Sequence, residues 1–432
     1  MTLRTPARTP LRVALLGLGT VGGAVARGLL ERGPDLARAA GGRPIHLVAV
    51  GVRDPDRPRA VTLPRAIVRT DDLVAVGVRD PDRPRAVTLP RAIVRTDDLA
   101  AVAVDPGVDV VVELIGGLEP AGALISAALA GGRSVVTANK ALLARRGAEL
   151  EAEARRTGAS LRFEAAVAGG IPVLGPLASD LAANRWSSVS GIVNGTTNFM
   201  LTAMTEAGWD YATVLADAQS RGYAEADPSG DVEGRDAADK LAILARLAFG
   251  EWPDVTAIRR SPPAVEGDAA PGITGVTAEV IAAAADLGLV VKLVARAQRG
   301  EDGAVGAGVV PSAVPAGSPL GRTGGVTNIV ELAGEPIGRV RFGGPGAGGE
   351  ATSSAVLGDL VAIARGIGSS WAGLPPADRA STVADVLSGT RRWFYVLPRG
   401  GGALTEPVTL DQARDEARAA GVSGPLYPLL EE

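Results

Sequence analysis

The sequence contains no cysteine among its 432 residues. Disulfides, thiolate metal ligands, iron–sulfur clusters and cysteine nucleophiles are therefore excluded, and this composition suits a reducing compartment such as the cytoplasm. The chain has one histidine, His46, which lies within an apolar segment. Histidine-based zinc sites and histidine-dependent dehydrogenase mechanisms therefore lack their residues, and we expect His46 to have a structural or surface role.

Long apolar runs and excess positive charge are also missing. The opening residues, Met1 to Pro10, are polar and do not resemble a secretory signal. No uninterrupted run approaches the roughly 18–20 apolar residues of a membrane helix. The net charge of -4 gives no attraction to nucleic acid or to anionic membranes. We therefore expect a cytoplasmic protein without nucleic-acid or membrane partners, and the length predicts at least two domains.

The first third of the chain alternates apolar strands with helices. Continuous apolar strands in this alternation indicate a parallel sheet covered on both faces, the Rossmann type of α/β fold. Strands are expected at 11–16, 45–52, 108–114 and 134–137, and helices at 21–32, 119–130 and 142–157. Farther along, helices are expected at 234–249, 352–365 and 410–420, and a strand at 393–397.

An internal repeat interrupts this region. Residues 48–73 recur letter for letter as 74–99, an offset of 74 − 48 = 26. Solenoids need at least three diverged copies, so two identical ones indicate a recent tandem duplication or a sequence-assembly error. We expect one copy to follow the native path and the other to bulge from the surface, since long surface insertions cost little closure entropy.

A glycine pattern, Gly17-x-Gly19-x-x-Gly22, stands between the first expected strand and the first expected helix. In this context the first glycine permits a tight turn, the second lets the backbone approach a pyrophosphate, and the third lets helix and strand pack closely. The pattern alone is weak evidence for a nucleotide site in a chain with 57 glycines. The expected strand before it and the expected helix after it favour a dinucleotide site over a purely structural turn.

The end of the second strand bears on the choice between NAD and NADP. It reads Arg53-Asp54, and the second repeat copy offers Arg79-Asp80 as a rival pair. An arginine can pair with the 2′-phosphate of NADP, whereas an acidic residue suits the ribose of NAD. We favour Arg53 and, modestly, NADP.

Two segments carry candidate catalytic lysines. Lys140 follows the strand at 134–137, which places it at the carboxyl end of the sheet, where ligands of such folds bind. Asp236 and Lys240 lie four residues apart on one face of the helix at 234–249. Burial lowers the pKa of a lysine and a nearby carboxylate raises it, so the pair can hold a proton-transferring amine. Alone, either segment is also compatible with an ordinary charged surface.

Taken together, the segments resemble homoserine dehydrogenase over about residues 11–368. The motifs that carry the resemblance are GLGTVGGA at 17–24, ELIGG at 113–117, TANK at 137–140, EAAVAGGIP at 164–172, GIVNGTTN at 191–198, the segment 222–240, and GPGAGG at 344–349. The resemblance implies reversible, NAD(P)-dependent interconversion of L-homoserine and L-aspartate 4-semialdehyde in threonine, methionine and isoleucine biosynthesis. It also implies a homodimer.

The resemblance further implies a role for each site residue. Lys240, Lys140 and Asp236 would be catalytic, and Glu225, Asp231, Gly195 and Thr196 would bind substrate. The cofactor would contact Gly17, Gly19, Thr20, Val21, Gly22, Arg53, Gly116, Gly117, Lys140, Gly348 and Gly349. A monovalent cation such as Na⁺ or K⁺ would be held by Glu164 and by the carbonyls of Val167, Gly169 and Ile171, since oxygen-only sites suit hard cations.

The expected organisation is a Rossmann domain at 11–157, an α+β catalytic and dimerisation domain at 158–340, a segment at 341–368 that returns to the cofactor domain, and a short tail at 369–432. Family members often end in a regulatory ACT domain, and its usual opening is not recognisable in the tail. The alternative hypothesis is that the chain is a catalytically impaired NAD(P)-binding homologue whose cofactor site was disrupted by the duplication.

Overall fold

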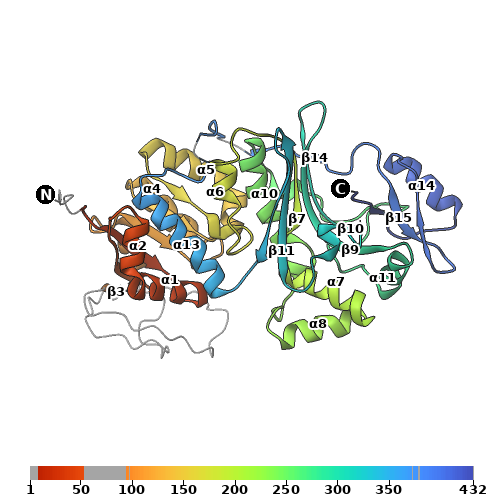
Figure 1. Cartoon of the computed structure of the whole chain (residues 1–432), viewed down its shortest axis with the longest axis horizontal. Helices are drawn as coiled ribbons and strands as arrows, with labels where there is room; N and C mark the ends of the chain where they lie inside the picture. Colours follow the sequence, from red (N-terminus) through yellow and green to blue (C-terminus); the bar gives the residue numbers. More distant parts are fainter. Residues whose placement is uncertain (1–7, 53–93, 97, 372, 378–379, 432) are drawn as a thin grey trace. The chain divides into compact units, whose positions relative to one another are not determined.

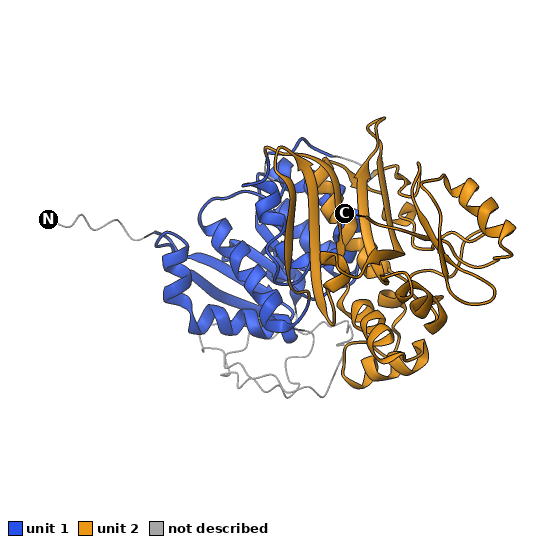
Figure 2. Ribbon diagram, turned by 45° about the vertical axis from the view of Figure 1, so that its right-hand side comes forward, with its two compact units in different colours: residues 1–182, 347–379 blue, residues 183–346, 380–432 orange. Residues whose placement is uncertain are grey.

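The structure is a computed structural model that describes residues 8–52, 94–96, 98–371, 373–377 and 380–431. The chain forms two compact units (Figure 2). Unit 1 comprises Met1–Ala182 and Ala347–Arg379, and unit 2 comprises Ala183–Gly346 and Ala380–Glu432. The sequence places the corresponding divisions after residues 157, 340 and 368.

Unit 1 is built on a six-stranded sheet in the order β3-β2-β1-β4-β5-β6. Every neighbouring pair in it is parallel, and the order reverses beside β1, as in doubly wound dinucleotide-binding folds. The strands are β1 (Leu11–Leu16), β2 (Ile45–Gly51), β3 (Val94–Thr96), β4 (Val110–Glu113), β5 (Ser134–Thr137) and β6 (Leu161–Arg162). The predicted parallel sheet is confirmed.

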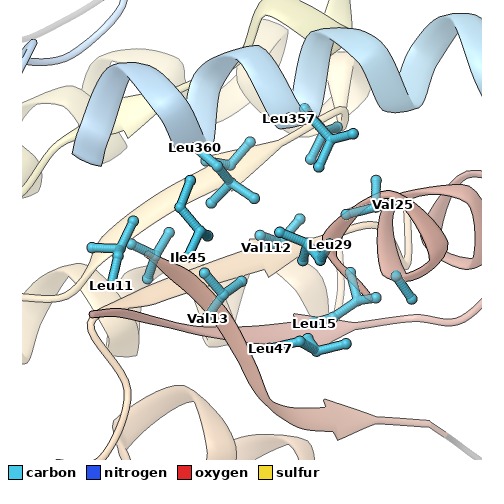
Figure 3. Packing of buried hydrophobic residues seen from close by; sticks show 14 of the residues in the cluster. Leu11, Val13, Leu15, Val25, Leu29, Ile45, Leu47, Val112, Leu357 and Leu360 are labelled. Carbon is cyan, nitrogen blue, oxygen red and sulfur yellow. The ribbon is translucent and has the colours of Figure 1, made fainter. Parts of the chain in front are cut away.

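Unit 1 also contains seven described α-helices: α1 (Thr20–Glu31), α2 (Gly33–Ala39), α3 (Leu99–Val104), α4 (Ala121–Ala130), α5 (Lys140–Thr157), α6 (Leu174–Ala178) and α13 (Gly349–Ala364). The last returns from far along the chain and packs beside α1, where Leu357 and Leu360 meet the apolar face of the sheet (Figure 3). The packing is close, because a Cβ on Gly28 of α1 would lie 2.6 Å from Leu357 Cδ1.

The repeat contributes to this sheet from both copies. β2 ends inside the first copy, whereas β3 and the first residue of α3, Leu99, belong to the second. Residues of the two copies pack together, since a Cβ on Gly51 would lie 2.5 Å from Leu99 Cδ2. Residues 53–93 lie outside the described part, so which copy follows the native path stays a prediction.

Unit 2 contains a second six-stranded sheet, in the order β12-β11-β7-β9-β10-β14. All its pairs are antiparallel except that of β10 with β14. Its strands are β7 (Arg185–Ile192), β9 (Leu289–Arg299), β10 (Val305–Pro315), β11 (Thr327–Glu335), β12 (Gly338–Pro345) and β14 (Ala384–Asp385). With its helices this sheet makes unit 2 an α+β domain, as expected.

Between Ala183 and Gly346, unit 2 contains the helices α7 (Gly195–Ala207), α8 (Tyr211–Ser220), α9 (Ser229–Val232), α10 (Arg235–Phe249), α11 (Ala278–Ala285) and α12 (Pro319–Arg322). The helix α10 is buried around most of its circumference, including Lys240, which marks it as an interior helix rather than a surface one. A left-handed glycine stands at each end, Gly234 and Gly250, and fixes where it begins and ends.

The C-terminal residues belong to unit 2. β15 (Trp393–Val396), β16 (Gly402–Leu404) and β17 (Tyr427–Pro428) form a small antiparallel sheet beside α14 (Leu410–Ala419) (Figure 1). Short strands β8 (Trp252–Pro253) and β13 (Ala380–Ser381) pair in parallel. Trp393, Ala413 and Leu426 form one core with Val310 of the large sheet. The strand and helix predicted in this tail are confirmed, and no described helix is long and apolar enough to span a membrane.

Candidate active site

The three glycines of the β1–α1 turn have three different physical requirements. Gly17 has a φ of +96°, and a Cβ there would lie 2.9 Å from the carbonyl oxygen of Leu114. A Cβ on Gly22 would lie 2.1 Å from the carbonyl oxygen of Gly17, so that position excludes any side chain. Nothing lies within 4 Å of the Cβ position of Gly19. The turn is therefore closed on its inner side and open at its middle glycine, as approach of a pyrophosphate requires.

A second helix begins beside this turn. A Cβ on Gly349, the first residue of α13, would lie 2.8 Å from the methyl carbon of Thr20, the first residue of α1. Both helices have a glycine N-cap, Gly19 and Gly348, without a side-chain capping bond. The first backbone N–H groups of α1 and α13 are thus left to an anion rather than to a capping side chain. The residues of unit 1 fit a dinucleotide.

A buried carboxylate organises the neighbouring loop. Glu113, fully buried at the end of β4, accepts hydrogen bonds from the backbone N–H groups of Ile115 and Gly116 at 2.7 and 2.9 Å. It also accepts a bond from the Thr137 hydroxyl at 2.6 Å. Gly116 and Gly117 both adopt left-handed backbone angles. The carboxylate therefore ties the ends of β4 and β5 to the double-glycine turn.

Asn139 extends this network to Lys140. Its backbone N–H donates to the Thr137 hydroxyl at 3.0 Å, and its side-chain amide donates to the carbonyl of Gly117 at 2.6 Å. The side-chain oxygen of Asn139 caps α5 by accepting from Leu142 N–H at 3.1 Å. Lys140, the half-buried first residue of α5, is therefore held at a position set by Glu113, Thr137 and Asn139.

Unit 2 gathers a second set of predicted residues. Lys240 Nζ donates to Asp236 Oδ2 at 2.6 Å and to the carbonyl of Val193 at 2.7 Å. The Asn194 side-chain nitrogen donates to Asp231 at 2.7 Å and to Asp236 at 3.0 Å. The lysine side chain is 11% exposed and that of Asp236 15%. The predicted pairing and burial of Lys240 are confirmed, and one amide joins the pair to Asp231.

Local backbone geometry explains why these residues meet. Asp231 lies in the short helix α9, and the left-handed Gly234 redirects the chain into α10, which carries Asp236 and Lys240. Asn194 caps α7 by accepting from Thr197 N–H at 2.9 Å, so its amide nitrogen remains for the two carboxylates. The network is therefore assembled by two helix starts and one glycine turn.

The other residues predicted to bind substrate lie near the start of α7 or on the loop before α9. Gly195 is the first residue of α7, and a Cβ there would lie 2.9 Å from the carbonyl of Val326. The Thr196 hydroxyl donates to the carbonyl of Tyr223 at 2.8 Å, which ties α7 to the loop. Glu225 is exposed, and its carbonyl accepts from the side chain of Gln219 at 3.0 Å.

The segment predicted to hold a cation has an unusual environment. The buried Glu164 carboxylate accepts from the N–H groups of Val173, Leu174 and Gly175 at 2.8, 2.9 and 2.6 Å. Burial, and then the nearby Asp359 carboxylate, raises the pKa of Glu164 above its usual range. The described residues contain no cluster of three or more His, Cys, Asp or Glu side chains suited to a metal. A cation here would therefore depend on backbone oxygens.

Several residues of these networks were not predicted from the sequence. Asn194 and Glu113 lie inside motifs that the sequence singled out, but their polar contacts join segments distant along the chain. The signal that could have found Glu113 is a carboxylate at the end of an otherwise apolar strand, where burial requires partners. Of the predicted residues, Arg53 lies outside the described residues. His46 is exposed on β2, as expected.

Two family models together match most of the chain. Residues 17–164 match the model of the homoserine dehydrogenase NAD binding domain, and residues 172–361 match that of homoserine dehydrogenase. The chain is 43% identical to a homoserine dehydrogenase of Synechocystis, covering 82% of this chain and 73% of that one. It is 41% identical to one of Corynebacterium glutamicum, covering 86% and 77%.

A solved structure extends the likeness to almost the whole chain. The homoserine dehydrogenase of Thiobacillus denitrificans aligns with a TM-score of 0.80 and 32% identity over 98% of both chains. Two family models that cover the glycine turn and the lysine–carboxylate network therefore agree with the relatives and with the fold. The chain belongs to the homoserine dehydrogenase family, whose members are NAD(P)-dependent oxidoreductases.

Proposed function

We propose that the Asn194, Asp231, Asp236 and Lys240 network binds and deprotonates L-homoserine during its oxidation to L-aspartate 4-semialdehyde. The main supporting observation is the 2.6 Å hydrogen bond from Lys240 Nζ to Asp236, two residues whose side chains are both nearly buried. An amine held this firmly has a fixed position from which to exchange a proton with a hydroxyl. In the reverse direction the same lysine donates a proton to the aldehyde oxygen.

The carboxylates of unit 2 suit the other end of the substrate. Homoserine carries an ammonium group, and Asp231 is a carboxylate that the Asn194 amide joins to Asp236 of the catalytic pair. We assign Asp231 and the exposed Glu225 to the ammonium, with Gly195 and Thr196 lining the same site. Carboxylates anchor an ammonium by charge-assisted hydrogen bonds, so this assignment predicts that their loss raises KM more than it lowers kcat.

The residues of unit 1 would hold the nicotinamide cofactor, which supplies hydride acceptance and donation when bound. Gly17, Gly19, Thr20, Val21 and Gly22 would bind its pyrophosphate at the start of α1, where backbone N–H groups favour an anion. Gly116, Gly117, Gly348 and Gly349 would line the side nearer the ring. Lys140 would then assist both cofactor binding and proton transfer.

NADP is the cofactor that we favour, because Arg53 follows the strand that normally contacts the ribose. The test is direct titration of the protein with NADPH and NADH, followed by the quench of tryptophan emission. Tighter binding of NADPH, lost in Arg53→Ala but kept in Arg79→Ala, would support the assignment. Equal affinity for the two cofactors would overturn it.

We also propose a monovalent cation held by the segment that starts at Glu164. The supporting observation is that the carbonyls of Val167, Gly169 and Ile171, all in buried residues, accept no hydrogen bond from any described residue. Buried carbonyls without partners are costly, and a hard cation such as Na⁺ or K⁺ satisfies them. Activity measured in tetramethylammonium buffer should therefore rise when either ion is added.

The family resemblance supports three further assignments. They are a homodimer, a cytoplasmic location, and a place in the biosynthesis of threonine, methionine and isoleucine. Light scattering during gel filtration tests the first of these. The impaired alternative gains no support, because the glycine turn and both lysines are intact. Turnover of homoserine with either cofactor is the experiment that decides between an active enzyme and an impaired homologue.

A further inference from the structure

Two arginines of unit 2 lie close together, and neither forms an ion pair with a described residue. Arg296 is on β9, and Arg391 precedes β15. Gln298 connects them, because its side-chain oxygen accepts from Arg296 Nε at 3.0 Å and its side-chain nitrogen donates to the carbonyl of Val386 at 3.4 Å. That carbonyl also accepts from Arg391 Nη2, at 2.9 Å. We call Arg296 and Arg391 the arginine pair.

The donors of the arginine pair are incompletely satisfied. Among described residues neither guanidinium forms an ion pair, and Arg391 Nε is buried without a hydrogen-bond partner. Nη1 and Nη2 of Arg296 likewise donate to no described acceptor. Burial, followed by the charge of Arg296, lowers the pKa of Arg391 to about 10. Arg391 Nη2 is engaged, because it also donates to the carbonyl of Ser388 at 2.8 Å. Both residues are only half-buried, and the donors that remain for a ligand from solvent are Arg391 Nη1 and the two Nη groups of Arg296.

The carboxylates around the arginine pair are already engaged. Glu331 pairs with Arg339 and Arg341 at 2.6 and 2.5 Å. Asp385 and Asp268 both pair with Arg259, at 2.9 and 2.7 Å. The group thus holds five arginines against three carboxylates, an excess of 5 − 3 = 2 positive charges. The arginines of this group are 259, 296, 339, 341 and 391.

Strand register places one strand between Glu331 and Arg296, and both oxygens of Glu331 are already paired with Arg339 and Arg341. Glu331 lies opposite Ser190, and Ser190 lies opposite Arg296. The two charged residues are therefore two strands apart, which is about 9–10 Å between their backbones. Because half-buried charges are normally paired, the excess points to a missing anion rather than to a different pairing within this unit.

We propose that the arginine pair is a binding site for a doubly charged oxyanion, the class that includes inorganic phosphate and phosphate monoesters. A guanidinium presents parallel N–H groups that match two oxygens of such an anion. Arg391 has its guanidinium 5.8 Å from the centre of the Trp393 ring, which restricts its orientation. Two guanidiniums of fixed position and an excess of two charges fit a dianion better than a monoanion.

The test is thermal unfolding of the full chain with increasing inorganic phosphate, against sodium chloride at matched ionic strength. Saturating NADPH is present throughout so that the phosphate-binding turn of unit 1 is occupied. The expected result is a saturable rise of the midpoint, on the order of 2–4 °C at ten times the dissociation constant. Arg296→Gln and Arg391→Gln should each remove this rise.

Arg185→Gln is the matched control, since Arg185 lies on the same sheet with its side chain 86% exposed and paired to Glu335. It should keep the full phosphate effect and report any general salt stabilisation. If Arg391→Gln does not fold, Arg391→Lys keeps the charge but loses the fork and should weaken phosphate binding at least several-fold. The proposal is overturned if wild-type protein has no saturable response, or if the variants of the arginine pair respond like Arg185→Gln.

Discussion

Lys240 Nζ lies 2.6 Å from Asp236 Oδ2, one turn away on α10, and that same oxygen accepts from Asn194 at 3.0 Å. The lysine also donates to the carbonyl of Val193, the residue before Asn194. Its ammonium is thus fixed by two acceptors, one on its own helix and one on the segment that leads into α7. Fixed donors and acceptors are what general acid–base chemistry requires, and the predictions below test how far this arrangement determines activity.

Lys240→Ala should lower kcat by about 10²–10⁴-fold, the usual contribution of a positioned proton-transfer group. Asp236→Asn should lower kcat less, since the amide retains shape but not charge. Arg235→Gln is the control, because Arg235 is the neighbouring cation on α10 and pairs with Glu233 with its side chain 53% exposed. Steady-state oxidation of homoserine measures all three. Near-normal turnover by Lys240→Ala would remove this lysine from the mechanism.

Glu113→Gln should raise the KM for the cofactor several-fold while leaving the KM for homoserine nearly unchanged. The carboxylate accepts three hydrogen bonds that hold the Gly116–Gly117 turn and Thr137, and a carboxamide cannot accept all of them. Glu151→Gln is the matched control, since Glu151 is also buried in unit 1 but pairs with Arg155 at 2.8 Å. Equal effects of the two variants on cofactor KM would mean that Glu113 acts only through stability.

Gly22→Ala should weaken cofactor binding by at least tenfold. The added Cβ would meet the carbonyl oxygen of Gly17 at 2.1 Å, which forces the turn apart. Gly23→Ala, one residue later in α1, meets nothing within 4 Å and should bind cofactor normally. It should also gain some stability, because alanine is favoured over glycine within helices by about 1 kcal/mol. Fluorescence titration with NADPH compares the pair, and similar affinities would contradict the assigned role of Gly22.

Lys292 gives unit 2 a pH-dependent stability. Burial lowers the pKa of Lys292 from 10.5 to about 8, although Asn198 and Thr323 accept hydrogen bonds from its amine. Below pH 8 the Lys292 amine is protonated in both the folded and the unfolded state, so the cost of burying its charge lowers the free energy of unfolding in full. Between pH 8 and 10.5 the unfolded state binds more protons, so stability rises with pH, by up to roughly 3 kcal/mol.

Lys292→Met should therefore flatten the increase in stability over this range. Urea unfolding at several pH values from 7.5 to 10.5 measures the difference between the two proteins. Other titratable groups contribute equally to the pH dependence of wild type and variant. Only the difference between the two slopes of stability against pH therefore reports on Lys292. Parallel curves for wild type and variant would contradict a depressed pKa for this amine.

The cofactor half of the fold could be predicted because its signals are local. Leu11–Leu16 and Ser134–Thr137 are short segments with mostly apolar interiors, and the structure has strands with those same bounds. Lys240 could also be predicted, since its partner Asp236 is one helical turn away. The large sheet of unit 2 was not predicted strand by strand. Its strand β10 (Val305–Pro315) is apolar on both faces and carries two prolines, so no alternation marks it.

The polar networks depend on contacts that no local pattern encodes. Asn194 meets Asp231 and Asp236 from 37 and 42 residues away, and Glu113 meets Thr137 from 24 residues away. The arginine pair is separated by 95 residues (391 − 296 = 95) and is joined only through tertiary packing. Sequence motifs located these segments, but only the folded chain determines which side chains bond.

The most direct test of the account is an absorbance assay of the purified chain with L-homoserine and NADP⁺ or NAD⁺. We predict homoserine-dependent formation of the reduced cofactor at 340 nm. We also predict loss of this activity in both Lys240→Ala and Lys140→Ala, with the folded state retained. No formation of reduced cofactor with either nucleotide, from protein that binds NADPH, would contradict the proposed catalytic network.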